Sequence, residues 1–355
     1  MGQWVTTGTQ SKMKRKLLLA LNLIILGLGS ASAQSPFATL QHGDNLTVYY
    51  GTGAFTDANA AAANGDIITL SPGHFVCDGD ITISKAITIR GAGMSPDTAA
   101  GTFATTVRAN NNHTIHINVP GDSNNVLQIV GINFSLTVYL ENLSNATFEK
   151  CIIMPHGTGA KRMCGCVFTN CLVSCSEMDN SSLNTFINSF VNNKSSNCDI
   201  LVNCIYTGED LEYGTYRNCI ITYGNYLYTL PSSDAQNCLF ITKGDRGKST
   251  LSDELKVNNY EITGEYGSGD YTYNWAGVFK KYDGSYTIYT IINPTSKTFE
   301  LTDEAKSRFH GNDGTEVGVN GGLAPFNHTV LNYKITVPQS STTEGNLDIN
   351  VEKVN

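Results

Sequence analysis

The sequence predicts an all-β protein folded as a single-stranded parallel β-helix, a solenoid in which each coil of the chain stacks on the one before. Three observations predict this fold. A short apolar motif recurs at intervals of 15 to 20 residues. The polar residues are mainly Asn, Thr, Ser and Gly, which favour turns over long helices. Short runs of strand-forming residues lie between those turns, which is typical of a solenoid of β-strands.

The repeat is clearest around five cysteines that each open a short apolar run. Asn precedes four of them and Lys150 precedes the fifth. With Phe134 and Ser189 in the same frame, the repeated positions are 134, 151, 171, 189, 204, 219 and 238. A unit of this length cannot hold a helical hairpin, but it holds three short strands and their turns. Equivalent residues of successive coils would then stack about 4.8 Å apart.

The ten cysteines are not expected to form five disulfides. Cysteine behaves as a small hydrophobe in a stacked interior column, and an Asn before it suits a turn with a left-handed residue. We therefore predict buried, reduced thiols at Cys151, Cys171, Cys204, Cys219 and Cys238. Parallel neighbours in such a column point their Cβ atoms the same way, which opposes bridging. Cys164, Cys166 and Cys175 are more open to pairing, and the spacing of Cys164 and Cys166 is weak support for a metal site.

The charge balance limits the classes of partner. The 355 residues include 23 Lys and Arg against 31 Asp and Glu, and charged residues make up only 15%. That fraction is well below the roughly 25% usual in soluble domains and disfavours a coiled coil. No basic patch suited to nucleic acid is visible, and the acidic balance disfavours anionic lipid.

The first 33 residues have the pattern of a secretory signal peptide. Basic residues from Lys12 to Lys16 precede an apolar run from Leu17 to Leu28, and small residues follow with Ala31 and Ala33 at a cleavage spacing. We expect export to the periplasm, the cell surface or the extracellular space. No later apolar stretch approaches the length of a membrane span, so none is expected.

The rest of the chain reads as one elongated domain. Residues 34–64 form an N-terminal segment with a cap helix from Phe55 to Asn64, and residues 65–243 form the β-helix. Residues 244–310 are a Tyr-rich excursion with late rungs, where a rung is one coil. Residues 311–355 form a final rung and two capping strands, the latter predicted from alternation over Val330–Val337 and Leu347–Val351.

The asparagine turns carry a family resemblance. Residues 55–243 resemble the right-handed parallel β-helix proteins of the pectate-lyase-like superfamily, on the asparagine-ladder positions Asn133, Asn170, Asn188, Asn203, Asn218 and Asn237. The segment from residue 299 to 326 resembles the last rung of uncharacterised secreted β-helix proteins of gut Bacteroidetes. The resemblance implies a right-handed coil and a carbohydrate-related role.

An acidic stripe is the first candidate site. Placing the strand after the long turn of each rung puts Glu177, Asp179, Asp199 and Glu212 outward, with Arg162 at one end and Tyr226 and Tyr228 at the other. Carboxylates one or two rungs apart would have glycosidase spacings, and they could alternatively hold Ca²⁺. A register error of one residue would instead turn them inward, and an ordinary solvated face is a further reading. The motifs of polygalacturonases and calcium pectate lyases are absent.

Other candidates lie outside the stripe. His113 and His116 are expected to face outward beside buried Ile115 and Ile117, and Lys161 and Arg162 lie in the longest turn, where they could line a cleft. Trp275 and the tyrosines around it could stack on sugar rings or pack onto the helix.

Two functions from different classes follow. The first is a non-catalytic exported β-helix that binds a polysaccharide or cell-surface glycan, or builds the cell surface, without a cofactor. The second is a polysaccharide lyase or glycoside hydrolase that acts through the acidic stripe. An activity screen on acidic and neutral polysaccharides separates them.

Overall fold

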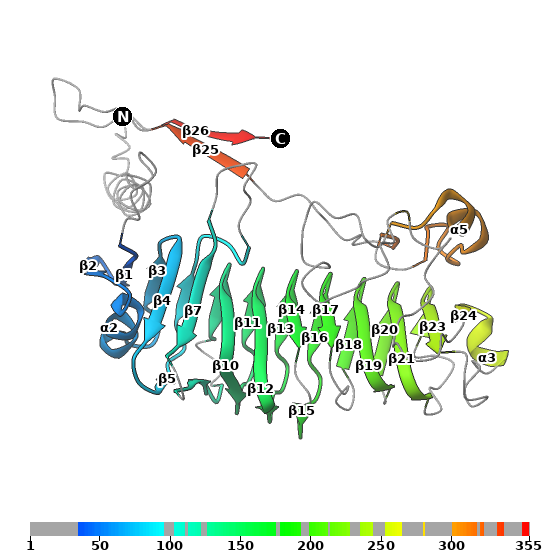
Figure 1. The fold of residues 1–355 in the computed structure, drawn as a ribbon, viewed down its shortest axis with the longest axis horizontal. Coiled ribbons are helices and arrows are strands. Elements are labelled where there is room, and N and C mark those ends of the chain that lie inside the picture. Colours follow the sequence, from blue (N-terminus) through cyan, green and yellow to red (C-terminus); the bar gives the residue numbers. More distant parts are fainter. Residues whose placement is uncertain are drawn as a thin grey trace, which may run out of the picture.

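The computed structural model forms an elongated stack of short strands (Figure 1). It describes residues 35–95, 103–110, 113–121, 126–174, 178–192, 199–211, 214–227, 235–243, 253–264, 280, 300–317, 320–322, 332–336 and 350–354. Long parallel sheets run along the stack with the strands in regular register, so the predicted parallel β-helix is confirmed. The predicted signal peptide, residues 1–33, lies outside the described residues. No helix among the described residues is long and apolar enough to cross a membrane.

The first sheet contains eleven strands in the order β2-β1-β3-β6-β9-β11-β13-β16-β18-β20-β22. From β3 onward, each strand pairs in parallel with the next, one rung further along the axis. The strands of this stack are β3 (Ile67–Leu70), β6 (Thr88–Arg90), β9 (Gln128–Val130), β11 (Thr147–Glu149), β13 (Val167–Thr169), β16 (Thr185–Ile187), β18 (Asp199–Val202), β20 (Gly214–Arg217) and β22 (Ala235–Gln236).

The second sheet runs beside the first in the order β24-β23-β21-β19-β17-β14-β12-β10-β7-β4. Its strands are β4 (Gly73–Cys77), β7 (Thr105–Ala109), β10 (Asn133–Glu141), β12 (Ile152–Lys161), β14 (Leu172–Ser174), β17 (Phe190–Asn192), β19 (Ile205–Leu211), β21 (Ile220–Leu227), β23 (Leu239–Lys243) and β24 (Tyr260–Gly264).

A third face forms where β10 and β12 bend. The first residues of β10 pair with β7, and after a register shift its last residues pair with β8 (Ile115–Ile117). β8 pairs in turn with β5 (Ile81–Ile83), and the end of β12 pairs with β15 (Met178–Asp179). This third face consists of β5, β8, β15 and the C-terminal ends of β10 and β12.

The N-terminal end of the stack is covered by the predicted cap helix. Helix α2 (Ala54–Ala61) buries Ala54, Phe55 and Ala58 against the first rungs. The antiparallel strands β1 (Phe37–His42) and β2 (Asn45–Tyr50) extend the first sheet on the same side. A helix and an antiparallel pair cover backbone groups that a solenoid would otherwise leave open at its end.

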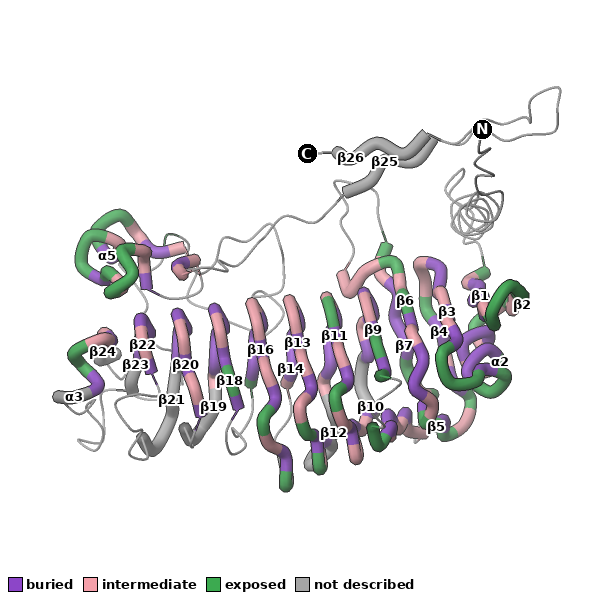
Figure 2. Tube along the Cα trace, turned by 180° about the vertical axis from the view of Figure 1, so that it is seen from behind, coloured by how far each residue is buried: buried purple, intermediate pink, exposed green. Residues whose placement is uncertain are grey.

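The core consists of columns of identical or similar side chains. Buried and exposed positions alternate along the strands of the first sheet (Figure 2), as expected for strands with one face inward. Phe148, Phe168 and Phe186 stack with ring centroids 4.8 and 4.9 Å apart and nearly parallel planes. Since this spacing equals the strand spacing, the rings follow directly from the register.

Left-handed backbone at each corner explains the asparagine positions. Asn170, Asn188, Asn203, Asn218 and Asn237 have φ of 50–56°. Lys150 adopts φ 52° in the same column. Asparagine tolerates this conformation better than most residues, so the turn prediction is confirmed.

The predicted position of the first corner in the asparagine column is wrong by two residues. Asn133 lies inside β10, in register with Ile152 of β12, and the corner residue before it is Gly131 at φ 68°. Phe134 accordingly aligns with Ile153, and Ile132 precedes Cys151 in the column of side chains. The error arose because the corner requires a backbone conformation, which glycine supplies as well as asparagine.

The column of cysteines is confirmed as buried and reduced. Cys151, Cys171, Cys204, Cys219 and Cys238 are at most 3% exposed, and each is a free thiol. The thiols lie against carbonyl oxygens at the corner; Cys204 Sγ is 3.2 Å from Phe186 O and 3.3 Å from Val202 O. Ser189 occupies the same column, and its hydroxyl donates to the equivalent carbonyls of Phe168 and Ile187. Cysteine here therefore fills space and also supplies a weak donor.

Two short helices lie toward the C-terminal end of the stack: α3 (Asp253–Lys256) precedes β24, and α5 (Asp303–Arg308) follows it in the sequence. The described part of 300–322 contains α5 and lies along the asparagine corner. Asn312 N–H donates to Asn237 Oδ1 at 2.9 Å, and Asn203 Nδ2 donates to Gly321 O. The ring of Phe309 meets that of Tyr260 edge to face.

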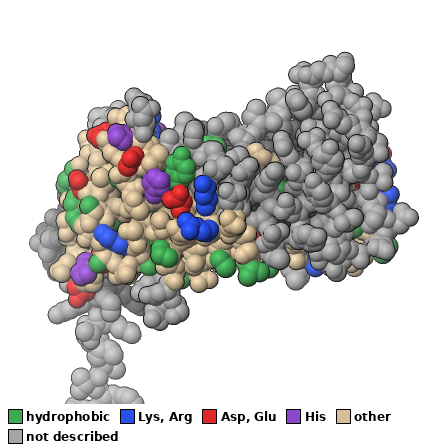
Figure 3. Space-filling model, turned by 90° about the horizontal axis from the view of Figure 1, so that it is seen from below, with side chains coloured by type: hydrophobic (Ala, Val, Ile, Leu, Met, Phe, Trp, Pro, Cys, Tyr) green, Lys and Arg blue, Asp and Glu red, His purple; other side chains and the backbone are tan. Residues whose placement is uncertain are grey.

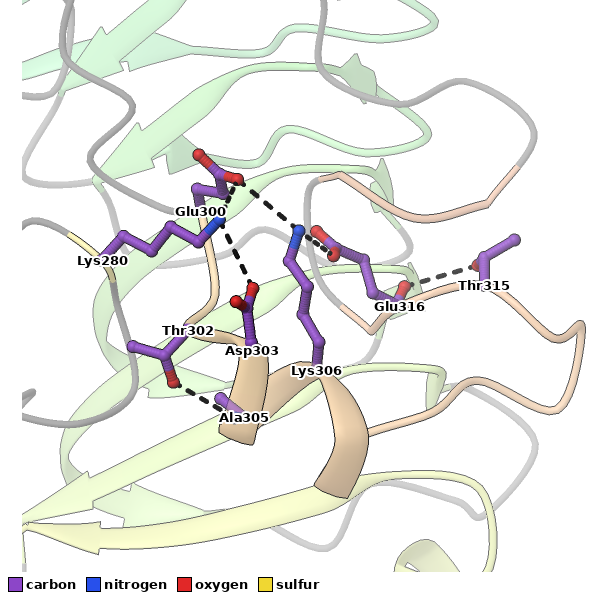
Figure 4. Close-up of polar contacts among 8 residues, drawn as sticks. All are labelled: Lys280, Glu300, Thr302, Asp303, Ala305, Lys306, Thr315 and Glu316. Atoms are coloured by element: carbon purple, nitrogen blue, oxygen red, sulfur yellow. Dashed lines mark hydrogen bonds and ion pairs between the residues drawn. The ribbon is translucent and has the colours of Figure 1, made fainter.

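A group of charges holds the segment around α5 together (Figure 4). Lys280 Nζ lies 2.7 Å from Glu300 Oε1, and Lys306 Nζ lies 3.1 Å from Glu316 Oε2. Thr302 caps α5 by accepting from Ala305 N–H. The two predicted C-terminal strands are also present, as β25 (Asn332–Thr336) and β26 (Asn350–Val354), and they pair with each other in a separate antiparallel sheet.

Candidate functional site

The third face gathers polar side chains at its N-terminal half. Its register places Thr82, His116 and Tyr139 side by side on β5, β8 and β10, and Glu141, Lys161 and Asp179 side by side on β10, β12 and β15. Seen from the side of this face, histidine, acidic and basic side chains cluster together (Figure 3). We call this group of residues the third-face cluster.

His116 is the most constrained side chain of the third-face cluster. Ile115 and Ile117 on either side are buried, so His116 faces outward as the sequence predicts. Its ring stacks on Tyr139, with centroids 5.1 Å apart and planes at 11°. Nδ1 is 3.2 Å from Glu141 Oε2, and Nε2 is 2.9 Å from Thr114 Oγ1. Two partners on β10 and one residue directly before β8 thus fix both the position and the orientation of the imidazole.

Asp80 anchors the strand end that carries Thr114. Its Oδ1 accepts from Thr114 N–H at 2.7 Å and lies 3.2 Å from Thr114 Oγ1. His113 Nδ1 approaches the same oxygen at 3.4 Å. The backbone hydrogen bond from Thr114, followed by the weaker contacts, lowers the pKa of Asp80, so this carboxylate is ionised at neutral pH. Asp80 holds Thr114 in place chiefly through the main chain.

Lys161 and Arg162 continue the third-face cluster onto the next rung. Lys161 lies between Glu141 and Asp179 in register, but neither Lys161 nor Arg162 forms an ion pair with another described residue. Arg162 is exposed and sits at a corner with φ 54°. Two adjacent cations without a partner among the described residues are suited to an anionic group on a ligand.

The prediction that Asp199 faces outward with Asp179 is wrong. Asp199 is 2% exposed and opens β18 of the first sheet, in register with Gly214. Its Oδ1 accepts from the backbone N–H of Asn184 at 3.0 Å and lies 3.2 Å from Asn184 Nδ2. The coil from Ser189 to Cys204 has only 15 residues, so Asp199 falls in the first sheet. Its carboxylate serves the fold as an acceptor for a buried N–H.

The other predicted stripe residues are only partly placed. Asp179 and Arg162 do lie on the third face or its edge. Tyr226 lies in β21, in register with Asp210. Glu177, Glu212, Tyr228 and Trp275 lie outside the described residues. The structure therefore places Asp179 within the third-face cluster and Arg162 beside it, and it separates Asp199 from both.

No metal centre emerges from the part of the chain that the structure describes. Within it, no group of three or more His, Cys, Asp or Glu residues could hold an ion. Cys164 is exposed while Cys166 is buried, so the two thiols do not share one site. Burial raises the pKa of Cys166 to about 11, which keeps it a neutral thiol.

Sequence reasoning missed Thr114, Tyr139, Glu141 and Asp80. Tyr139 and Glu141 reach His116 through parallel pairing across 23 and 25 residues, whereas Thr114 and its partner Asp80 reach it through the turn before β8. The sequence did contain one signal for two of them: Tyr139 and Glu141 flank the buried Leu140, and in a strand this alternation turns both of them outward.

Comparison with known proteins adds no identity to this geometry. No protein-family model, no curated protein and no solved structure matches this chain significantly.

Proposed function

We propose that the protein is an exported parallel β-helix that binds an acidic polysaccharide through its third face. The supporting observation is an aromatic stack beside two cations that have no ion-pair partner among the described residues. Parallel β-sheets present such groups at fixed intervals of about 4.8 Å, which suits a polymer that extends along the axis. The signal-like N-terminus and the resemblance to pectate-lyase-like proteins are consistent with this role.

The aromatic part of the proposed surface is Tyr139 with His116. One face of Tyr139 is stacked on the imidazole, which holds the phenol ring in a single orientation. Tyr139 is only partly buried, so part of the phenol ring remains accessible to a sugar ring.

The charged part selects the kind of sugar. Lys161 and Arg162 supply cationic donors one rung from Tyr139. A guanidinium beside an ammonium binds a carboxylate or sulfate more strongly than a neutral hydroxyl. We therefore expect acidic polysaccharides to bind in preference to neutral ones, with affinity that falls as salt rises.

Binding is tested by calorimetry with polygalacturonate and alginate against dextran. We expect the double variant Lys161→Ala/Arg162→Ala to lose at least about tenfold in affinity, since about 1.4 kcal/mol corresponds to that factor. Tyr139→Ala should weaken binding as well. Tyr50→Ala and Arg90→Ala are the matched controls, because both residues are exposed and lie on other strands. Equal loss in the controls would contradict the proposed surface.

The alternative, a lyase or hydrolase acting through the acidic stripe, is weakened by the burial of Asp199. It is tested on the same polysaccharides. Release of reducing ends or of unsaturated uronate that Asp179→Asn abolishes would favour it over simple binding.

A further inference from the structure

The arrangement around His116 has chemistry that binding does not use. Thr114 Oγ1, His116 and Glu141 form a continuous hydroxyl–imidazole–carboxylate chain, with links of 2.9 and 3.2 Å. Glu141 Oε2 accepts a hydrogen bond from His116 Nδ1, which favours the imidazole tautomer that carries the proton on Nδ1. Nε2 is then the free base, and it faces the hydroxyl of Thr114.

A second histidine in the same protein shows what is special about this one. His42 Nδ1 also contacts a carboxylate, Asp66 Oδ1, at 2.7 Å. Among the described residues, however, His42 has no hydroxyl on its other nitrogen. A histidine–carboxylate pair is thus an ordinary structural contact in this chain. The hydroxyl on the second nitrogen is the feature that distinguishes His116.

The three linked side chains of Thr114, His116 and Glu141 are accessible to a ligand and are held in place by their contacts. His116 is 33% exposed and Glu141 29%, so a ligand on the face can reach them while the contacts still hold them. Thr114 Oγ1 lies closer to the imidazole than to Asp80, 2.9 against 3.2 Å, and Asp80 is occupied by the backbone N–H at 2.7 Å. The hydroxyl also donates to Asp80 Oδ1 at 3.2 Å, so the relay requires its single proton to turn from Asp80 to His116 Nε2 before Thr114 attacks.

We propose that Thr114 is the nucleophile of an esterase relay, with His116 as general base and Glu141 as its orienting partner. The substrate class is a small carboxylic ester, such as an O-acyl group on a polysaccharide. That the natural ester is carried by a polysaccharide rests on the proposed function, whereas the relay itself does not.

The reaction balances without a cofactor. Thr114 Oγ forms a bond to the ester carbonyl carbon while its proton passes to His116 Nε2. The tetrahedral intermediate expels the alcohol oxygen, which takes that proton, and leaves the acyl group on Thr114. Water then gives a proton to His116 and attacks the acyl carbon, which releases the acid and restores Thr114. The sum is ester plus water giving acid plus alcohol.

The test uses the full chain with p-nitrophenyl acetate. We expect a burst of p-nitrophenol and one acetyl group on Thr114, located by peptide mass spectrometry. Thr114→Val and His116→Phe should abolish the acetylation, the second while keeping a ring against Tyr139. Glu141→Gln should slow the burst at least about a hundredfold, as loss of the orienting carboxylate does in related relays.

Two variants keep the outcome interpretable. Thr114→Ser retains a hydroxyl and should retain the burst, which separates loss of the nucleophile from loss of the fold. His74→Phe makes the matched change at an exposed histidine of β4 and should leave the burst intact. Absence of acetyl-Thr114 in the wild-type chain, or a burst unchanged in His116→Phe, overturns the relay. Acetylation of Thr114 in a chain that binds no polysaccharide would leave the relay standing and overturn its assignment to a glycan ester.

Discussion

Single residues with left-handed backbone decide where each coil turns. Besides the asparagine column, residues 145, 165 and 183 form a second column, aligned by the bridges between Ser144, Cys164 and Ser182. Asn145 and Gly165 suit positive φ, whereas Leu183 does not, and Leu183 is 58% exposed at φ 58°. The backbone of a β-helix thus tolerates a poor residue at one corner because its neighbours along the axis fix the conformation.

Replacing Leu183 by asparagine should stabilise the protein. Leucine in a left-handed backbone conformation costs about 1 kcal/mol of conformational free energy, and asparagine adopts that conformation more readily. Urea unfolding followed by fluorescence would measure it. Leu46→Asn is the matched control, because Leu46 is 42% exposed in the extended strand β2 and should give no gain. An equal gain at both sites would mean that removal of an exposed apolar side chain, and not relief of the left-handed backbone, causes the stabilisation.

A buried thiol should make stability fall at high pH. Burial raises the pKa of Cys166 from 9.0 to about 11. Between these values the unfolded chain loses the thiol proton while the folded chain keeps it, so stability is complete below pH 9 and falls as pH rises toward 11. The loss from this residue is about 1 kcal/mol at pH 10.

Cys166→Ala isolates that contribution. Ala146 occupies the same column one rung earlier, so alanine fits the site. In the presence of a reductant, the urea midpoint should fall less between pH 8 and pH 10 in the variant than in the wild type. Identical pH dependence in both proteins would show that the thiol of Cys166 ionises normally.

At the scale of elements, the sequence predicted the repeat better than the register. The column of cysteines was predictable because small side chains at near-constant spacing specify stacking directly. Gly131 was missed because its corner is defined by backbone conformation and not by asparagine. Asp199 was misplaced because a coil of 15 residues shortens the path between strands. The partners of His116 depend on pairing between strands far apart in sequence, which periodicity alone does not specify.

The cysteine column should be chemically inert in the folded protein. Burial raises the pKa of Cys171, Cys204 and Cys238, so these groups stay protonated at neutral pH. Iodoacetamide should alkylate the exposed Cys164 in native protein and the column only in urea, as read by peptide mass spectrometry. A disulfide between any two column cysteines, or their alkylation as fast as Cys164, would contradict the stacking.

At the scale of the whole molecule, the two ends of the solenoid are closed by different means. Helix α2 and the antiparallel strands β1 and β2 close the N-terminal end (Figure 1). Near the other end, Asn259 accepts from Cys238 N–H and donates to Ala235 O and Leu255 O. The segment 300–322 then returns along the corner from Asn237 to Asn203. Each rung otherwise contacts its neighbours, so stability is expected to be local along the axis.

Disturbing the returning segment should therefore loosen only the rungs that it touches. A Cβ at Gly321 would overlap the carbonyl oxygen of Glu316, so Gly321→Ala should lift the segment from the asparagine corner. We expect faster hydrogen exchange at the corner residues 203, 218 and 237 and in α5, with exchange in β3, β6 and β9 unchanged. Gly53→Ala is the control, since nothing lies within 4 Å of its added Cβ and its φ is −80°. Because a quasi-one-dimensional stack transmits a local defect only through neighbouring interfaces, a uniform rise in exchange over all rungs would show instead that the molecule unfolds as one cooperative unit.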